Sequence, residues 1–229
     1  MPNLSVRLSV ILNLVPESDL VADIGTDHGY LAIELIKSGK AKKVIASDIG
    51  EKPLKNAQKN IEKANVSGIE LVLSDGLSSL NERIADTVII AGMGGEVISG
   101  ILNRSNKVAK RKNTTFILQP TTSPEFLRRY LYDNGFEIIK EVAVFENGKL
   151  YSVMMAAFVD IKAEKEEGFY YIGLLSPFEE NGRLYIENQR ARLLKNITAL
   201  SSIESKQAEY NLYKSAFDYI EKILNIQGE

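Results

Sequence analysis

The residues best suited to chemistry form a turn of glycines and polar side chains near the start of the chain. The turn runs from Asp23 to Gly29, with an apolar stretch before it and a helix-like stretch after it. Gly25 and Gly29 let the backbone approach a ligand closely, and the first turn of the following helix offers N–H groups to a carboxylate or phosphate. Many nucleotide-binding folds contain such a turn, so by itself it predicts only a nucleotide-like ligand.

Three further polar loops follow later apolar runs. Asp48, beside Ile49, stands 25 positions after Asp23, where a carboxylate can accept both ribose hydroxyls of an adenosyl ligand. Asp75-Gly76 is placed to meet the adenine edge, and the loop Gly92–Gly95 is placed beside the reacting group. Such loops meet in one crevice at the carboxyl ends of parallel strands. The cofactor-binding candidates are therefore Asp23, Gly25, Thr26, Gly29, Asp48, Ile49, Asp75, Gly76, Gly92 and Gly94.

Each of these features alone has a structural alternative. Asp48 can serve as a helix cap, and Gly94-Gly95 can permit tight packing. A nicotinamide dehydrogenase is the main rival for the whole pattern, but it usually shows the motif Gly-x-Gly-x-x-Gly. Here Asp27 would repel a dinucleotide pyrophosphate, whereas it would attract the sulfonium and amine of S-adenosylmethionine. The comparison favours methyl transfer.

The elements that must position these loops alternate between short apolar strands and helices, which is typical of a parallel sheet covered on both faces. The expected strands are Leu20–Ile24, Lys43–Asp48, Ile69–Ser74, Asp86–Ala91 and Thr114–Gln119. The expected helices are Leu4–Leu14, Tyr30–Ser38, Lys52–Ala64, Glu96–Leu102 and Pro124–Asn134. The strands Phe136–Phe145 and Leu150–Val159 flank Asn147-Gly148, a strong hairpin signal. The fold class is thus α/β, a Rossmann-like seven-stranded class I methyltransferase sheet.

The pattern changes after about residue 160. Tyr213, Phe217, Ile220 and Leu224 follow heptad spacing, and Ser201–Glu204 resembles a capping box that begins a new helix. We expect a C-terminal helical hairpin, or coiled coil. The expected domains are a catalytic domain over residues 1–160 and a helical domain over residues 161–229.

Composition narrows the function further. The chain has no cysteine and one histidine, which excludes disulfides and leaves almost nothing for a metal site. No apolar run is long enough to cross a membrane and no signal peptide is evident, so we expect a cytoplasmic protein. The net charge of −2 hides local basic clusters, for which a solvated loop and an RNA contact are both possible interpretations. The RNA-binding candidates are Lys40, Lys43, Arg104, Lys107, Lys110, Arg111 and Lys112, with Arg128-Arg129 as a weaker cluster.

The chain resembles the bacterial tRNA (adenine-22-N1)-methyltransferase family. The resemblance rests on Asp23–Leu31, the Gly92–Gly95 loop, Leu118-Gln119-Pro120 and the terminal hairpin, and it covers nearly the whole chain. It implies S-adenosyl-L-methionine as cofactor and N1 methylation of an adenine in the D-arm region of tRNA. It also implies that the coiled coil helps to hold the tRNA, and neither a metal nor an obligate protein partner is expected.

Adenine N1 can attack the methyl group directly, so catalysis should consist of positioning and charge stabilisation. Asp27 is the candidate to stabilise the cationic ring, with contact to the methionine ammonium of the cofactor as an equal alternative. His28 can donate to the base or ribose, Tyr30 can stack, and Arg7 can hold a phosphate or Asp27; packing or a surface ion pair is the alternative for each. Met93 can offer the flipped base an apolar wall.

Two other function classes remain open at this stage. One is a methyltransferase for a small molecule or protein, for which the basic clusters are irrelevant, so that charge reversal at Lys110, Arg111 and Lys112 leaves activity unchanged. The other is a non-catalytic RNA-associated protein that keeps S-adenosylmethionine as a structural ligand and tolerates Asp27→Ala.

Overall fold

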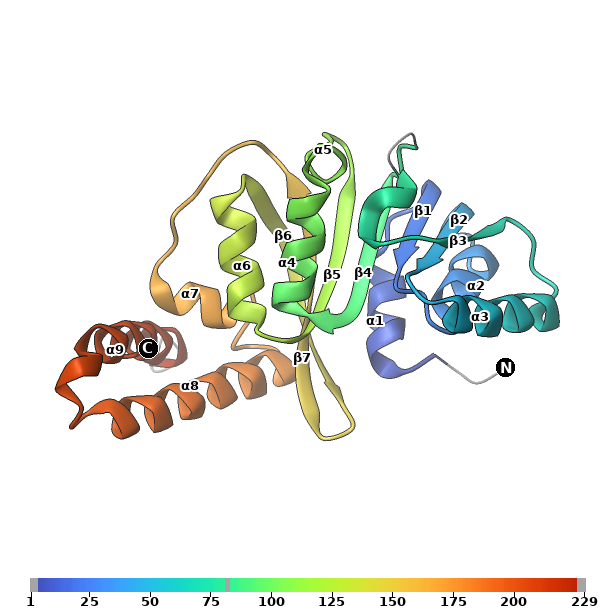
Figure 1. Ribbon diagram of the computed structural model, residues 1–229. Coiled ribbons are helices and arrows are strands. Elements are labelled where there is room, and N and C mark those ends of the chain that lie inside the picture. The colour runs from blue at the N-terminus through green and yellow to red at the C-terminus, as the bar shows by residue number, and fades with distance from the viewer. Residues whose placement is uncertain (1–3, 81–82, 226–229) are drawn as a thin grey trace.

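A seven-stranded sheet in the order β3-β2-β1-β4-β5-β7-β6 forms the centre of the molecule (Figure 1). The computed structural model describes residues 4–80 and 83–225. The strands are β1 (Ser18–Ile24), β2 (Ala41–Asp48), β3 (Ile69–Leu73), β4 (Thr87–Gly94), β5 (Thr115–Thr122), β6 (Phe136–Glu146) and β7 (Lys149–Phe158). β1 to β5 are parallel, and β7 lies antiparallel to both β5 and β6. The predicted Rossmann-like sheet is confirmed.

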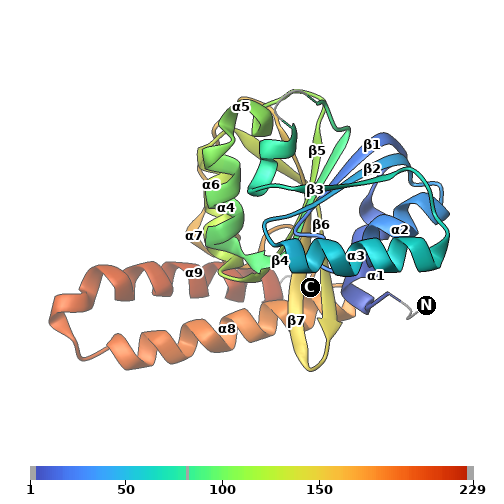
Figure 2. The ribbon, with the colours of Figure 1, turned by 45° about the vertical axis from the view of Figure 1, so that its right-hand side comes forward.

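Helices cover both faces of the sheet, as the views in Figures 1 and 2 show. The helices of this part are α1 (Val6–Leu14), α2 (Tyr30–Lys37), α3 (Glu51–Ala64), α4 (Gly95–Arg104), α5 (Asn106–Ala109) and α6 (Pro124–Asp133), with the 3-10 turn η1 (Gly76–Leu80). On β4, Val88 and Ile90 pack into a core with Ile98 of α4, whereas Ile89 packs on the opposite side with Leu31 of α2. Strands buried on both faces explain why these sequences are continuously apolar.

The antiparallel edge of the sheet forms as the turn chemistry predicts. Asn147 and Gly148 both have positive φ, of 51° and 75°, as a two-residue hairpin turn requires. Since β7 is antiparallel to β5, this turn lies at the edge of the sheet where the parallel strands end. The turn therefore lies at the same edge as the predicted site.

The C-terminal part is an antiparallel helical hairpin of α8 (Glu180–Leu200) and α9 (Gln207–Asn225), which projects away from the sheet (Figure 2). Leu193 of α8 packs with Ile220 and Phe217 of α9, which confirms the hairpin and its apolar seam. A short helix that the sequence analysis did not predict, α7 (Glu167–Ile172), joins the hairpin to α6. The predicted capping box is wrong, because a 3-10 turn η2 (Glu204–Lys206) precedes α9 in its place. The domain boundary at residue 160 stays a prediction.

Within residues 4–80 and 83–225, no helix is both long and apolar enough to span a membrane. The same part of the chain contains no group of three or more His, Cys, Asp or Glu side chains arranged to hold a metal ion.

Candidate active site

A cavity of about 270 Å³ opens at the carboxyl ends of β1 and β4. It brings together residues from α1, from the turn after β1, and from the ends of β4 and β5. The residues that line it are Arg7, Leu8, Asp23, Gly25, Thr26, Asp27, His28, Tyr30, Leu31, Ala91, Gly92 and Gln119. Eight of the residues predicted from the sequence for cofactor binding or catalysis therefore line this one cavity: Arg7, Asp23, Gly25, Thr26, Asp27, His28, Tyr30 and Gly92.

The turn after β1 is tied to its neighbouring strand by two hydrogen bonds. The N–H groups of Gly25 and Thr26 both donate to the carbonyl of Ser47, at 2.8 and 3.0 Å. Gly25 has φ of +78°, and a Cβ at this position would collide with Cε of Met93. Met93 thus packs over the turn and against the core, and it is not among the residues that line the cavity. The predicted role of Met93 as a wall for the base stays a prediction.

Asp23 is a buried carboxylate facing this cavity. Its side chain accepts a hydrogen bond from the Thr26 hydroxyl at 2.6 Å. Burial raises the pKa of Asp23 to about 6, the Thr26 hydroxyl opposes that shift, and the nearby Asp48 carboxylate adds to it. Burial disfavours the ionised form of this carboxylate, and a cationic ligand in the cavity would stabilise that form.

Replacement of Asp23 by asparagine should stabilise the ligand-free protein at neutral pH. Because the pKa of Asp23 is higher in the folded state, folding favours its protonated form, so its contribution to stability falls as pH rises from about 4 to about 6. We expect Asp23→Asn to raise the free energy of unfolding at pH 7.5 by on the order of 2 kcal/mol and to give almost no gain at pH 4. Urea unfolding at both pH values measures this. Asp19→Asn, at an exposed carboxylate paired with Lys42, is the control and should give no gain. An equal gain for Asp23→Asn at both pH values would contradict the explanation.

Asp27, His28 and Tyr30 follow one another along the mouth of the cavity. Asp27 has a positive φ of 50°, and its side chain is 65% exposed. The Nε2 atom of His28 lies 3.3 Å from Oδ2 of Asp27, and the His28 ring stacks on Tyr30 with centroids 5.5 Å apart. The backbone N–H of Asp27 faces Oδ2 of Asp48 at 3.4 Å. The turn therefore presents a carboxylate, an imidazole and a phenol to the same opening.

Two residues that had no predicted role hold the site at the ends of β4 and β5: Gln119 of β5 and Glu146 of β6. Gln119 is fully buried and bonds to both Arg7 and Gly92, and Glu146 binds Arg7 from the other side. A glutamine at the end of a buried strand was the available signal for the first. No local signal identifies Glu146, which is 139 positions from Arg7.

Comparison with known proteins identifies the family of the chain. A family model described as "Methyltransferase domain" matches residues 4–154, more than half of the sequence. This chain belongs to the methyltransferase domain family. The Bacillus subtilis (strain 168) tRNA (adenine(22)-N(1))-methyltransferase is 36% identical over 154 residues, which are 67% of this chain and 64% of that enzyme. By sequence, therefore, the match spans less than two thirds of that relative.

Solved structures extend the similarity over the full length. The crystal structure of the B. subtilis m1A22 tRNA methyltransferase TrmK has a TM-score of 0.82 at 25% identity and covers 97% of this chain and 99% of that one. M. capricolum TrmK in complex with S-adenosyl-homocysteine has a TM-score of 0.80 at 29% identity, with 96% and 99% covered. The resemblance to the tRNA (adenine-22-N1)-methyltransferases is confirmed, including the C-terminal hairpin.

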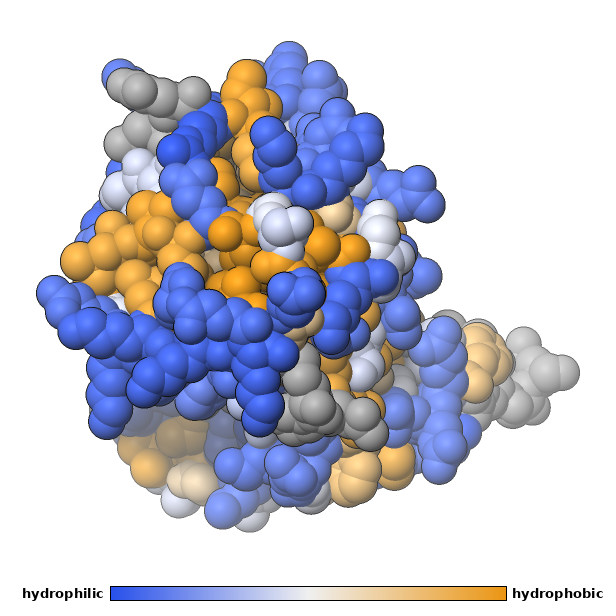
Figure 3. Space-filling view, turned by 90° about the vertical axis from the view of Figure 1, so that its right-hand side faces the viewer, coloured by the Kyte–Doolittle hydropathy of each residue, from blue (hydrophilic) through white to orange (hydrophobic). Residues whose placement is uncertain are grey.

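In this methyltransferase domain, the loops after β2 and β3 lie along the same edge but outside the cavity wall. The N–H of Ser74 donates to the carbonyl of Asp48 at 2.9 Å, which places the two loops side by side. Ile49 and Leu73 are 73% and 56% exposed, so aliphatic surface is available where the sequence predicts the adenine. β3 is at one end of the sheet order, and Figure 3, which shows the face of the molecule on that side, contains an apolar area bordered by hydrophilic residues. The donor set fits an adenosyl ligand: carboxylates for hydroxyls and amine, and apolar surface for the ring.

Asp75 and Arg104 have each other as partner. Oδ1 of Asp75 lies 3.4 Å from Nη2 of Arg104, and Gly76 packs against Ile101 of α4. Asp75 was predicted to bind the cofactor and Arg104 to bind RNA, and both roles stay predictions. Gly29 and Gly94 immediately precede α2 and α4 and are not among the residues that line the cavity, so their predicted contacts with the cofactor stay predictions.

Most residues of the basic clusters lie at the amino edge of the sheet and none of them lines the cavity, although the Arg104 side chain reaches Asp75 after β3. The segment from Arg104 to Lys112 leads from the end of α4 to the start of β5, and Lys40 and Lys43 stand at the start of β2. Arg111 points inward and donates to the carbonyls of Leu80 and Arg83. Lys40 donates to the carbonyl of Val15, and Lys110 lies over the ring of Phe158. RNA contact through these residues stays a prediction, and charge reversal at Arg111 would also remove a structural contact.

The prediction that Arg128 belongs to a weaker RNA-binding cluster is wrong. Its side chain is fully buried and paired with Glu141 at 2.6 Å, so it cannot touch RNA. The helical period of α6 explains the difference from Arg129, because adjacent positions on a helix point about 100° apart. Arg129 lies on a neighbouring face and binds Glu167 at 2.6 Å, with 41% of its side chain exposed.

Proposed function

We propose that this protein transfers a methyl group from S-adenosyl-L-methionine to N1 of an adenine in tRNA, at position 22 in the D-arm region. The observation that carries the proposal is the convergence of Asp23, Asp27 and the Gly92 segment on one cavity, in a chain of this family. The names of the relatives supply the acceptor atom and position. The cytoplasmic location expected from the sequence belongs to the same proposal.

When bound, the cofactor would supply a methyl group on a positively charged sulfur; the adenine N1 lone pair would form the new N–C bond as the C–S bond breaks, with S-adenosyl-homocysteine as the leaving group. The chain then has three tasks. The buried carboxylate of Asp23 and the carboxylate of Asp48 bind the polar groups of the cofactor. A base must leave its stack to enter the cavity. The Ala91–Gly92 segment forms the wall against which this extruded base lies. The carboxylate of Asp27 stabilises the positive charge that develops on the ring.

The proposal predicts transfer of labelled methyl groups from S-adenosylmethionine to an unmodified tRNA transcript. Nucleoside analysis should recover the label as 1-methyladenosine, and a matched transcript with guanosine at position 22 should accept none. Label in another nucleoside would overturn the assignment of the atom. Absence of label from RNA, with cofactor binding intact, would overturn the tRNA assignment and favour a small-molecule or protein acceptor.

A further inference from the structure

The end of β4 contains a bulge at the wall of the cavity. Ala91 pairs with Gln119 and Met93 pairs with Pro120, so Gly92 stands between them without a partner residue in the β4–β5 ladder. Gly92 has φ of +78°, which favours glycine. Bulges next to active sites redirect a short stretch of backbone. The extra residue leaves a backbone N–H that the ladder does not satisfy.

The side chain of Gln119 takes up this N–H. Its Oε1 accepts hydrogen bonds from Gly92 N at 3.1 Å and from Arg7 Nη1 at 3.0 Å, and its Nε2 donates to the Pro120 carbonyl at 2.7 Å. Gln119 is 0% exposed. These partners fix the orientation of the amide, because a flipped amide would turn its NH₂ group toward two donors.

Arg7 is itself held on its far side. Its backbone N–H donates to Oε1 of Glu146 at 2.9 Å, its Nε lies 3.5 Å from Oε2 of the same carboxylate, and its guanidinium lies 5.3 Å from the centre of the Tyr151 ring. Although partial burial opposes it, hydrogen bonds from the Arg7 segment hold the pKa of Glu146 below its usual value. The amide of Gln119 therefore connects Gly92 to α1 and, through Arg7, to the β6–β7 turn.

We propose that Gln119 is a positioning residue for the methyl acceptor. A peptide unit is planar and trans, so a hydrogen bond to the Gly92 N–H also fixes the Ala91 carbonyl on the other side of the same peptide. Ala91, Gly92 and Gln119 all line the cavity. Gln119 thus sets the wall that the target adenine meets, while the cofactor is held by the turn after β1. This inference rests on the proposed function.

Three substitutions test the inference. Gln119→Met keeps the length of the side chain without a strong acceptor, and Gln119→Asn keeps the amide but is one methylene shorter. Gln119→Glu keeps an acceptor at the original reach for Gly92 and Arg7 but loses the NH₂ donor to the Pro120 carbonyl. We expect Gln119→Met and Gln119→Asn to lower kcat for tRNA about 30- to 100-fold, the size of effect that a misplacement of about 1 Å produces. The dissociation constant for S-adenosyl-homocysteine should stay within about threefold, and Gln119→Glu should recover at least tenfold of the lost kcat.

Hydrogen exchange of the Gly92 amide gives a readout that does not depend on activity. Its exchange should quicken at least about tenfold in Gln119→Met and return toward the original rate in Gln119→Glu. If exchange of the Gly92 amide is faster in Gln119→Met but the unsubstituted protein methylates no tRNA, the contact between Gln119 and Gly92 is supported and the proposed function is rejected. A kcat within threefold of the original in any folded variant lacking the contact would overturn the inference. It would also be overturned by a Gln119→Glu protein in which exchange of the Gly92 amide is restored while kcat stays at the level of Gln119→Met. If Gln119→Met fails to fold, the comparison of Gln119→Asn with Gln119→Glu decides.

Discussion

Replacement of Asp27 by asparagine is expected to lower kcat for tRNA methylation by about 100- to 1000-fold, the usual cost of removing one preorganised electrostatic contact from an active site. Methylation at N1 leaves the adenine ring cationic at neutral pH, and Asp27 brings a carboxylate to the mouth of the cavity. Asparagine is a suitable replacement because it adopts the positive φ of 50° that Asp27 has, so the turn should keep its shape.

Steady-state kinetics also separate the two roles open to Asp27. If its carboxylate acts on the developing charge of the base, kcat falls and the dissociation constant for S-adenosylmethionine hardly changes. If it contacts only the cofactor ammonium, the dissociation constant rises and kcat at saturating cofactor is kept. Glu34→Gln is the matched control, since it removes a carboxylate from the neighbouring helix α2 that pairs with Lys37 and does not line the cavity. Unchanged kcat and unchanged cofactor affinity in Asp27→Asn would remove Asp27 from the site and favour a non-catalytic role for the protein.

The turn around Asp27 was predictable because its information is local. Glycine and aspartate in a few consecutive positions predict a tight turn of the backbone, and an alternation of apolar runs with helices predicts a parallel sheet. The individual apolar strands, the hairpin at Asn147-Gly148 and the turn after β1 are each encoded within a few residues. Physical patterns of this range are visible in a single sequence.

Other features depend on contacts between distant segments, which no local pattern reveals. The bond between Arg7 and Gln119 joins residues 112 positions apart, so neither residue alone reveals it. The run from Arg104 to Lys112 looks like one cationic surface along the chain, yet Arg111 points inward and Arg104 pairs with Asp75. α7 was not predicted because six residues are too few for a helical period to be recognised.

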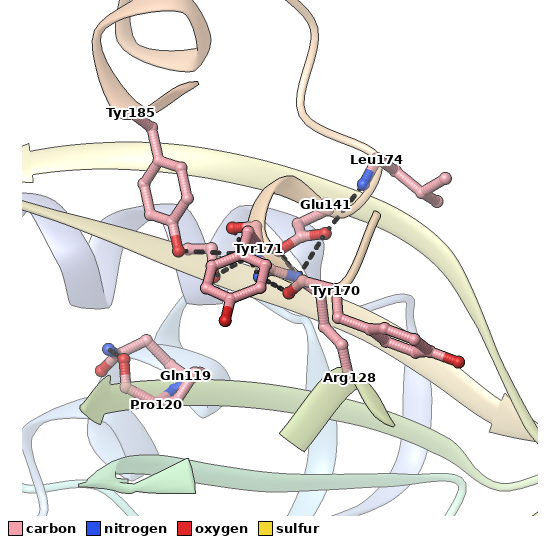
Figure 4. Close-up of polar contacts among 9 residues, drawn as sticks. Gln119, Pro120, Arg128, Glu141, Tyr170, Tyr171, Leu174 and Tyr185 are labelled. Atoms are coloured by element: carbon pink, nitrogen blue, oxygen red, sulfur yellow. Dashed lines mark hydrogen bonds and ion pairs between the residues drawn. The ribbon is translucent and has the colours of Figure 1, made fainter. Parts of the chain in front are cut away.

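The buried arginine of α6 leads to the largest expected effect on stability. Arg128 donates to Glu141 and to the backbone carbonyls of Tyr170 and Tyr171, and the same carboxylate accepts from the Leu174 N–H at 3.0 Å (Figure 4). Although burial lowers the pKa of Arg128, the neighbouring Glu141 carboxylate and Tyr185 raise it above its usual value, so the guanidinium stays charged. These contacts join strand β6 and helix α6 to helix α7, from which the chain continues into the C-terminal hairpin.

Arg128→Met should therefore lower the free energy of unfolding by about 3–5 kcal/mol, because it leaves the Glu141 carboxylate buried without its partner. The double variant Arg128→Met/Glu141→Leu should recover most of that loss, since no unpaired charge then stays in the interior. Arg129→Met is the matched control one position away. Its ion pair with Glu167 is 41% exposed on the arginine side, and its loss should cost about 1 kcal/mol or less. Urea unfolding of the four proteins measures these differences. If the double variant were no more stable than Arg128→Met, the lost free energy of unfolding would come from packing and from the two carbonyls of α7 rather than from the unpaired Glu141 carboxylate. The role of Arg128 would then be to attach the hairpin rather than to neutralise Glu141.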